Sequence, residues 1–478
     1  MSTGSGSHPP TDGGVTLEFH GAAQGVTGSM HILHLPGGPV ALDCGMFQGR
    51  REEARQLNES FPKSCHALKS VLLSHAHIDH SGRIPGLVRK GFRGPIHATD
   101  ATTDLCDVML ADAAHIQEED ARFWNEKRAR TPKEQIRPLY TLDDARAARR
   151  LFRSADYNTP VEFADGATVT YYEAGHILGS ACMLVQLTRP RPVRLLYTGD
   201  LGRFDIPILR DPTCPLPAAD YLITESTYAG RRHDDPTDMR RRLVAIIKDA
   251  VAAGGKVIIP SFSVGRTQHL LYELANAFAD KSLEPLPIYV DSPLSVNATD
   301  VFKHHPECYD EQASSFWRHE GDLFGHCCIR YITSVDESKS LNSLGEPCVI
   351  IAASGMCENG RILHHLKNNI EDPRNAVVIV GYMAQHTLGR RIVERRDELT
   401  IFGRLYRLLC RVEILNGFSA HADSRDFTRL LAPLASGLKA AFCVHGENAQ
   451  LEAMRQILLS AGCPAVHIPA PGEVFPLE

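Results

Sequence analysis

The sequence predicts an α/β fold in which one domain interrupts another. Within residues 15–225, residues 15–110 alternate short apolar strands with Gly-rich turns, and strands return at 160–225. Residues 226–408 alternate strands with helices. Residues 409–478 return to short strands that end in histidine-bearing loops. Because strands that alternate with helices form parallel βαβ units, the middle segment is expected to be an inserted domain with a mainly parallel sheet. An αββα sandwich split by this insertion explains the order.

The inserted segment shows the alternation most clearly. Apolar, β-prone runs are each followed or preceded by a helical pattern, which starts with residues 239–247 and recurs from Gln268. The four strands expected here are residues 256–260, 287–290, 348–352 and 376–380. In the first segment, residues 111–153 are charged with helical periodicity and predict a solvated helical excursion, or alternatively a wall that faces the substrate. Residues 1–14 are rich in Gly, Ser and Pro and predict a disordered tail.

Composition narrows the class of protein. The chain has 478 residues and a formal net charge of −6, so a nucleic acid would have to bind in a local groove and not on a basic coat. The 13 cysteines form no CxxC pair, and Cys327-Cys328 is the only close couple, which is typical of reduced thiols in the cytoplasm. Neither an apolar run of about 18 residues nor a signal-peptide core is present, so no membrane association is expected.

The most specific motif is the run at residues 74–80, SHAHIDH, directly after the apolar residues 71–73. The apolar residues predict a buried strand, which places the run on the loop at its C-terminal end. His75 and His77 can point the same way because alternate side chains of an extended segment share a face. Asp79 and His80 lie just beyond and can turn toward a second ion. Imidazole and carboxylate groups suit Zn²⁺, and pairs of metals about 3.5–4 Å apart hydrolyse phosphodiesters.

Further donor residues follow other predicted strands. His176 comes after residues 168–172, Asp200 ends the run 194–200, and His445 follows residues 441–444. Each could be a satisfied histidine or a turn-capping aspartate if taken alone. Their common position, at the end of an apolar run with glycine nearby, indicates one shared site.

From about Val15 to its C-terminus, the chain resembles the metallo-β-lactamase-fold nucleases of the β-CASP subgroup, in their RNA-processing branch. Asp43, the SHAHIDH run, His176 and Asp200 match the four motifs of the fold, and Glu225, His421 and His445 match β-CASP motifs A, B and C. Residues 21–29, 263–268, 291–294 and 353–357 are similar to the family as well. His386 departs from the pattern, because glycine is expected there, and this affects local loop geometry only.

The resemblance implies a role for each residue. His75, His77 and His176 are expected to hold one zinc, and a second set is expected to hold the other. That second set is Asp79, His80 and His445. Asp200 is expected to bridge both ions, and Asp43 to orient a ligand without binding metal itself.

Glu225 and His421 form the remaining pair. A carboxylate can keep an imidazole protonated, ready to donate to the leaving oxygen. Together with Asp79 and Asp200 they are the expected catalytic residues. The alternative for Glu225 is an ordinary surface or capping carboxylate.

Four residues of the inserted domain are expected to bind RNA phosphates in a cleft beside the metal site: Ser263, Arg266, Ser354 and Arg361. They follow predicted parallel strands near the starts of helices, where anions bind readily. The alternative is that the serines cap helices and the arginines pair with carboxylates.

The function expected is that of a dizinc ribonuclease that cuts single-stranded RNA, as an endonuclease, a 5′→3′ exonuclease or both. A homodimer is compatible with the resemblance. Three alternatives are a DNA nuclease, a hydrolase of a small thioester or lactam, and a non-enzymatic RNA-binding scaffold. A histidine at motif C resembles the RNA enzymes and so favours RNA over DNA. The inserted domain is superfluous for a small substrate, which disfavours the thioester or lactam hydrolase. Every expected metal ligand is retained, which disfavours a non-enzymatic scaffold.

Overall fold

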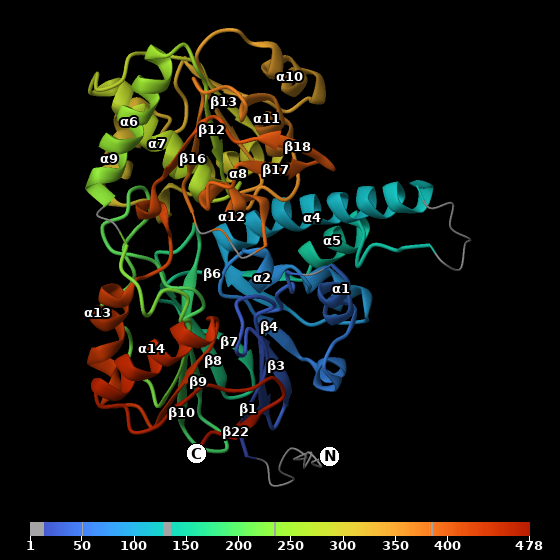
Figure 1. Cartoon of the computed structure of the whole chain (residues 1–478). Coiled ribbons are helices and arrows are strands. Elements are labelled where there is room, and N and C mark those ends of the chain that lie inside the picture. Colours follow the sequence, from blue (N-terminus) through green and yellow to red (C-terminus); the bar gives the residue numbers. More distant parts are fainter. Residues whose placement is uncertain (1–13, 50, 128–134, 234–235, 382, 384–385) are drawn as a thin grey trace. The chain divides into compact units, whose positions relative to one another are not determined.

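A computed structural model describes the chain in two compact units (Figure 1). The described residues are 14–49, 51–127, 135–233, 236–381, 383 and 386–478, so almost all of the predicted tail lies outside them. Unit 1 comprises Met1–Phe204, Asp211–Arg232 and His421–Glu478, and unit 2 comprises Asp205–Arg210 and His233–Ala420. Unit 2 therefore extends to Ala420, beyond the boundary expected at residue 408.

Unit 1 contains two seven-stranded sheets. The first has the order β22 (Val474–Pro476), β1 (Thr16–Gly21), β2 (Met30–Leu35), β3 (Gly38–Leu42), β4 (Ser70–Leu72), β5 (Ile96–Thr99) and β6 (Phe152–Ala155). The second has the order β21 (Val466–His467), β20 (Ala440–Cys443), β11 (Tyr221–Thr224), β10 (Val193–Tyr197), β9 (Ala181–Leu187), β8 (Ala167–Glu173) and β7 (Val161–Ala164).

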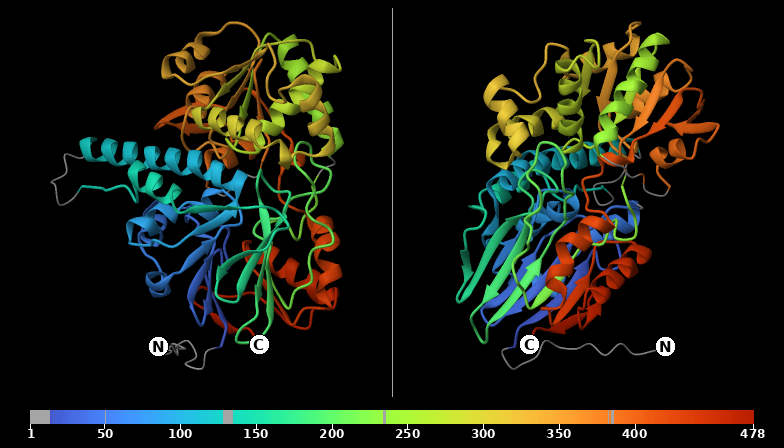
Figure 2. Two further views of the ribbon diagram at one scale, coloured as in Figure 1. Left: turned by 180° about the vertical axis from the view of Figure 1, so that it is seen from behind. Right: turned by 90° about the vertical axis from the view of Figure 1, so that its left-hand side faces the viewer.

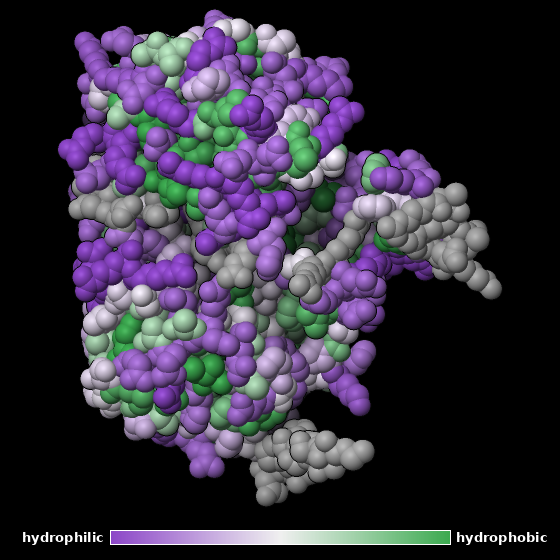
Figure 3. Space-filling model, in the orientation of Figure 1, coloured by the Kyte–Doolittle hydropathy of each residue, from purple (hydrophilic) through white to green (hydrophobic). Residues whose placement is uncertain are grey.

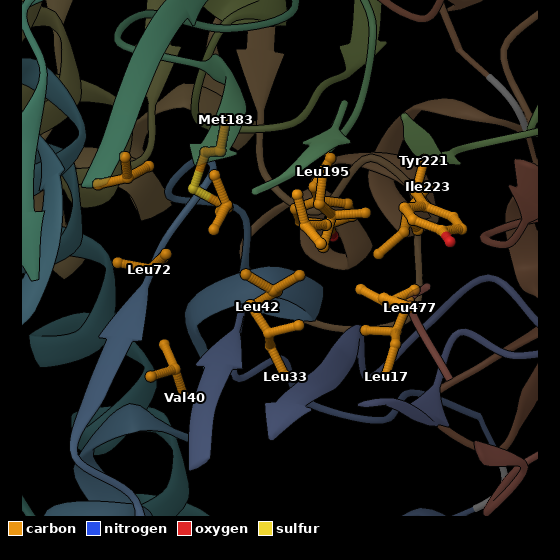
Figure 4. Close-up of a cluster of buried hydrophobic side chains, with 14 of the residues drawn as sticks. Leu17, Leu33, Val40, Leu42, Leu72, Met183, Leu195, Tyr221, Ile223 and Leu477 are labelled. Atoms are coloured by element: carbon orange, nitrogen blue, oxygen red, sulfur yellow. The ribbon is translucent and has the colours of Figure 1, made fainter. Parts of the chain in front are cut away.

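The two sheets pack face to face through apolar side chains that both sheets contribute to a shared core. In β9, Met183 and Val185 enter the core between the sheets, whereas Cys182 and Leu184 enter a second core on the other face. Figure 4 shows side chains of both sheets meeting in the core between them, Leu42 and Leu72 from the first and Leu195 and Ile223 from the second, among others.

Helices cover the outer faces of the sandwich. The apolar stripes of α13 (Ser424–Ala435) and α14 (Asn448–Ser460) pack on the second sheet. On the first sheet, α4 (Asp100–Lys127) contacts β5 and β6, and α5 (Leu142–Arg149) packs on α4. The remaining helices of this unit are α1 (Arg51–Glu59), η1 (Lys63–Ala67), α2 (Ile78–Ser81) and α3 (Ile84–Arg89). The described part of the predicted helical excursion contains the end of α4 and all of α5, and residues 128–134 lie outside the described residues. The layers are αββα (Figure 2).

Unit 2 is built on a six-stranded sheet in which every pairing is parallel. Its order is β14 (Ile329–Tyr331), β13 (Ile288–Asp291), β15 (Val349–Ala352), β12 (Val257–Pro260), β16 (Ala376–Ile379) and β19 (Arg411–Ile414). The four central strands are buried throughout and apolar except for Asp291 at the end of β13, as expected for a parallel sheet covered on both faces. Because β19 pairs with β16, the first part of the segment expected to return to the sandwich at residue 409 still belongs to unit 2.

The helices of unit 2 connect these strands. They are α6 (Pro236–Ala252), α7 (Arg266–Ala279), α8 (Pro293–His304), η2 (Pro306–Cys308), α9 (Glu311–Glu320), α10 (Val335–Ser340), η3 (Leu341–Ser343), α11 (Ile362–Asn369), α12 (Leu388–Val393) and η4 (Asn416–Phe418). The strands β17 (Glu398–Ile401) and β18 (Arg404–Arg407) form a separate hairpin. The predicted α/β class with an inserted parallel-sheet domain is confirmed.

Hydrophilic side chains cover most of the face of each unit in Figure 3, with apolar side chains exposed between them. Across the described ranges, no helix combines the length and the apolar character that crossing a bilayer requires.

Candidate zinc centre

The SHAHIDH run lies where the sequence places it, at the C-terminal end of β4. His75 and His77 are on the loop after the strand, and Asp79 and His80 are in the short helix α2. The segment after β3 packs directly against this helix: the Cys44 N–H donates to the His80 carbonyl at 2.8 Å. Gly45 makes the approach feasible, since a Cβ there would lie 1.5 Å from the Asp79 carbonyl oxygen.

Three imidazoles and one carboxylate form the first group: His75, His77, His176 and Asp200. His77 Nδ1 lies 3.2 Å from both His75 Nε2 and His176 Nε2, and Asp200 Oδ2 lies 3.6 Å from the same two nitrogens. Ligand atoms of a tetrahedral zinc at about 2.0–2.1 Å are roughly 3.3–3.4 Å apart. The donor set therefore has the dimensions of a zinc site.

Burial favours the metal-binding form of these histidines. It holds the pKa of His75 and of His176 well below 6.5 and lowers that of His77 to about 4. Neutral imidazoles keep a nitrogen lone pair for a cation.

Asp79, His80 and His445 form the second group. His445 Nε2 lies 3.5 Å from Asp79 Oδ2, and His80 Nε2 lies 3.3 Å from Asp200 Oδ1. His80 Nε2, His445 Nε2 and Asp200 Oδ1 are buried and make no hydrogen bond within the described parts of the chain. Buried polar atoms are normally satisfied, so three that converge without a partner fit a bound cation. Asp200 thus presents Oδ2 to one group and Oδ1 to the other.

Other side chains hold the histidines in orientation. Asp43 is fully buried, and its Oδ2 accepts from His80 Nδ1 at 2.6 Å and from the Tyr197 hydroxyl at 2.7 Å. The Ser74 hydroxyl donates to the same oxygen at 2.8 Å and lies 3.0 Å from His75 Nδ1. Asp43 therefore contacts His80 on the nitrogen that faces away from the second group, as expected of a supporting carboxylate.

Sequence reasoning assigned no role to Tyr197, Ser74 or Thr227. The Thr227 hydroxyl lies 3.2 Å from His445 Nδ1, which is also 3.7 Å from Asp200 Oδ1, and so helps to hold the last histidine in orientation. Each lies within three residues of a motif residue: Tyr197 is near Asp200, Ser74 is next to His75, and Thr227 is near Glu225. That proximity is the signal that could have indicated them.

Glu225 and His421 lie beside the first group. His421 Nδ1 is 3.2 Å from Glu225 Oε1 and 4.0 Å from Asp200 Oδ2. The Leu201 N–H donates to Glu225 Oε1 at 2.7 Å and holds the carboxylate in place. Burial lowers the pKa of His421, but the carboxylates of Glu225, Asp200 and Asp79 together raise it to about 9. These carboxylates therefore favour the protonated imidazole. Glu225, His421 and Asp200 also lie close enough to hold a cation themselves.

The four expected phosphate-binding residues lie in unit 2. Ser263 and Ser354 follow β12 and β15, which are neighbouring parallel strands, and Arg266 begins α7. The Ser263 and Ser292 hydroxyls are 3.2 Å apart.

Arg361 pairs with a carboxylate, which is the alternative to phosphate binding given above. Its Nη1 donates to Asp291 Oδ1 at 2.7 Å and its Nη2 to the Thr333 carbonyl at 2.6 Å. Asp291 is buried and also contacts His365 Nε2 and the Ser338 hydroxyl, each at 2.6 Å.

His386 has a φ of +70°, in the left-handed region that favours glycine. The position where the resemblance suggests glycine thus has the backbone conformation that glycine adopts most easily.

The sandwich and its two convergent His/Asp groups define a metallo-hydrolase scaffold. Comparison with known proteins agrees. Residues 267–392 match the Beta-Casp domain model, and residues 405–469 match the model of the Zn-dependent metallo-hydrolase RNA specificity domain.

Relatives extend the match over nearly the whole chain. Ribonuclease TTHA0252 of Thermus thermophilus is 35% identical over 92% of this chain and 95% of its own length. An RNase J-like protein of Methanocaldococcus jannaschii is 29% identical over 97% of this chain and 100% of its own length. Transcription termination factor FttA of the same organism is 30% identical over 91% of this chain and 67% of its own length. The chain belongs to the β-CASP family of metallo-β-lactamase-fold RNA nucleases.

A crystal structure of a protein of unknown function from Enterococcus faecalis has the same fold. Its TM-score is 0.55 at 13% identity, over 97% of this chain and 100% of that one.

Proposed function

We propose that this protein is a dizinc ribonuclease that hydrolyses phosphodiester bonds of single-stranded RNA, by endonucleolytic cleavage, 5′→3′ exonucleolytic cleavage or both. The observation that carries the proposal is Asp200, whose two carboxylate oxygens face two separate groups of imidazole and carboxylate ligands. His75, His77 and His176 would hold one zinc, Asp79, His80 and His445 the other, and Asp200 would bind both. Zinc in such a site acidifies water and stabilises charge on a phosphoryl group.

His421 is proposed as the general acid. Glu225 accepts a hydrogen bond from His421 Nδ1, which leaves the Nε2 proton for donation to the leaving oxygen of the RNA. The buried Glu225 is fixed by the Leu201 and Thr227 N–H groups, so it can stabilise the imidazolium without moving.

In unit 2, Ser263, Arg266 and Ser354 are proposed to bind RNA phosphates. Loops at the C-terminal ends of parallel strands are the usual ligand sites of open α/β sheets. Arg361 carries this proposal less well, because two of its donors already bind Asp291 and the Thr333 carbonyl.

RNA is favoured over DNA because residues 405–469 match an RNA specificity domain and because relatives are named ribonucleases. Cytoplasmic localisation is proposed because all thirteen cysteines are free thiols, as is usual in a reducing compartment.

The test uses 5′-labelled RNA and DNA of the same sequence, incubated with zinc-loaded protein and resolved by length. RNA should be shortened and DNA spared. Release of the labelled nucleotide first would indicate 5′→3′ exonuclease action, and discrete labelled fragments would indicate internal cuts. Asp200→Ala should abolish cleavage, whereas the control Asp165→Ala, at an exposed pair with Arg189, should retain it. Equal cleavage of DNA, or hydrolysis of a thioester without RNA cleavage, would favour the corresponding alternative.

A further inference from the structure

A second cluster of metal-binding side chains lies in unit 2, outside the machinery described above. His326, Cys327 and Cys328 precede β14 and offer one nitrogen and two sulfur atoms, all within 4.8 Å of one another. Cys327 Sγ is 3.8 Å from Cys328 Sγ and 3.7 Å from His326 Nδ1. The two sulfurs are therefore in van der Waals contact and not in a disulfide.

These distances have the dimensions of a tetrahedral site. With Zn–S of about 2.3 Å and Zn–N of about 2.0–2.1 Å, two sulfur ligands of one zinc are about 3.8 Å apart, and a sulfur and a nitrogen about 3.6 Å. Both separations involving Cys327 are close to these values. His326 Nδ1 also accepts a hydrogen bond from the Cys328 N–H at 3.3 Å, which the metal would replace.

The loop is held in this shape by its neighbours. The Ile329 N–H donates to the His326 carbonyl at 2.9 Å, and the Ile288 N–H at the start of β13 donates to the Cys328 carbonyl at 2.9 Å. The His326 ring stacks on Phe278 with centroids 4.7 Å apart and planes at 28°. The backbone is therefore tied to the edge of the parallel sheet, and little ordering would be needed on binding.

These thiols also differ from the rest in accessibility. Cys327 is exposed and Cys328 half-exposed, whereas ten of the thirteen cysteines are buried and Cys214 is the other exposed one. Burial and the adjacent Cys327 sulfur raise the pKa of the Cys328 thiol. A dication between the two sulfurs would reverse that effect by stabilising both thiolates.

We propose that His326, Cys327 and Cys328 form a surface site for a thiophilic d¹⁰ cation, with Zn²⁺ as its ion and water as the fourth ligand. Soft sulfur ligands with one imidazole select such ions over Mg²⁺ or Ca²⁺. Three contiguous protein ligands leave one coordination position open, so the ion should exchange readily, unlike a closed structural zinc.

Cobalt distinguishes this site from the candidate zinc centre of unit 1. That centre offers only nitrogen and oxygen ligands, so it cannot produce a thiolate-to-cobalt charge-transfer band. The full chain would be stripped with a chelator, kept reduced with a phosphine and titrated with Co²⁺. Wild type should show the near-ultraviolet thiolate band, and Zn²⁺ should remove it.

The double variant Cys327→Ser with Cys328→Ser should lose the band and about one equivalent of bound metal. His326→Gln should weaken the band, and the matched control Cys214→Ser should leave it unchanged. RNA cleavage by all of these variants should equal that of wild type, so failure of this site and failure of the proposed ribonuclease are separable. Absence of the band in wild type, or its persistence in the double variant, would overturn the proposal.

Discussion

The strand ends of the two units differ in how their polar groups are satisfied. In unit 1, His80 Nε2, His445 Nε2 and Asp200 Oδ1 are buried and make no hydrogen bond with any described residue. In unit 2, both oxygens of the equally buried Asp291 are bonded, to Arg361 on one side and to His365 and Ser338 on the other.

The difference shows which network needs a ligand. A buried carboxylate whose two oxygens are both bonded stabilises its own fold, whereas a carboxylate and imidazoles with unpaired atoms are costly until a cation arrives. The bonded carboxylate of unit 2 has the pattern of a scaffold, and the unpaired atoms of unit 1 have the pattern of a metal centre. Each prediction below tests one side of this comparison.

The largest effect is expected for Asp200→Ala. Because its two oxygens face both groups, loss of the carboxylate should deplete both zincs and lower turnover by more than about 10⁴-fold, beyond the loss of any general acid. Elemental analysis and RNA cleavage measure the two effects. Full metal content with full activity would refute the bridging role.

His421→Ala should lower turnover by about 10²–10⁴-fold while zinc content stays near wild type, because His421 is assigned to proton transfer. His445→Ala should instead deplete one zinc, because its Nε2 faces Asp79. Both variants would be assayed for metal and for turnover side by side. Equal zinc loss in the two would contradict this division of roles.

The pH dependence follows from the raised pKa of His421, about 9 without metal. The acid is active when protonated, so turnover should fall as pH rises through the pKa of His421. Bound cations repel the imidazolium and so lower the pKa of His421, which places this fall in turnover, the alkaline limb of the pH profile, at or below about pH 9. Glu225→Gln should move the limb to lower pH, because it removes the carboxylate that stabilises the charge. A pH profile unchanged in Glu225→Gln would exclude His421 as the acid.

The sequence predicts the parts of the molecule whose causes are local. Strands such as β12 and β15 are apolar throughout, and the histidine motifs lie beside them in the chain, so both were predicted. The chain returns to the sandwich at His421, later than the boundary predicted at residue 408. The reason is that β19 pairs with β16 and so belongs to unit 2, which no local pattern shows.

The short strand β14 and the hairpin β17–β18 gave no clear signal, since most of their residues are exposed or half-exposed. Contacts between residues far apart in the sequence also leave no local pattern from which they can be predicted. The hydroxyl of Tyr197 meets Asp43 across 154 positions, and Arg361 meets Asp291 across 70. No local pattern predicts whether an arginine near a helix start binds a phosphate or a carboxylate.

The supporting residues should have intermediate effects. Asp43→Asn removes the charge that fixes His80, and such changes cost about 10–100-fold in metal affinity. Tyr197→Phe removes only one donor to Asp43 and should lower metal affinity several-fold, which corresponds to a loss of about 0.5–1.5 kcal/mol. Competition with a chromogenic chelator would measure both, and a larger effect for Tyr197→Phe would reverse the ranking of the two contacts.

Arg361→Ala should affect stability more than RNA binding. It leaves one oxygen of the buried Asp291 without its donor, which costs about 1–3 kcal/mol and would lower the denaturant midpoint. Arg374→Ala, at an exposed pair with Asp372, is the matched control and should change little. A stable Arg361→Ala protein with weakened, less salt-dependent RNA binding would instead place a phosphate at this guanidinium.

The smallest effect, and the sharpest test of unit 2 as an RNA surface, is expected for Arg266→Ala. A net charge of −6 means that RNA must be held by a few placed donors and not by a general field. Arg266 begins α7 beside the loop of Ser263, where a phosphate would also meet the helix N-terminus. Loss of one phosphate contact should weaken binding modestly and reduce the slope of log K against log salt by about 0.7 for a single strand. Binding would be measured at several salt concentrations with Asp200→Ala protein, so that the RNA stays intact, and with Arg374→Ala as the control. If the slope is the same in Arg266→Ala and in the control, the polar strand ends of unit 2 are structural throughout, and the RNA path lies on other residues.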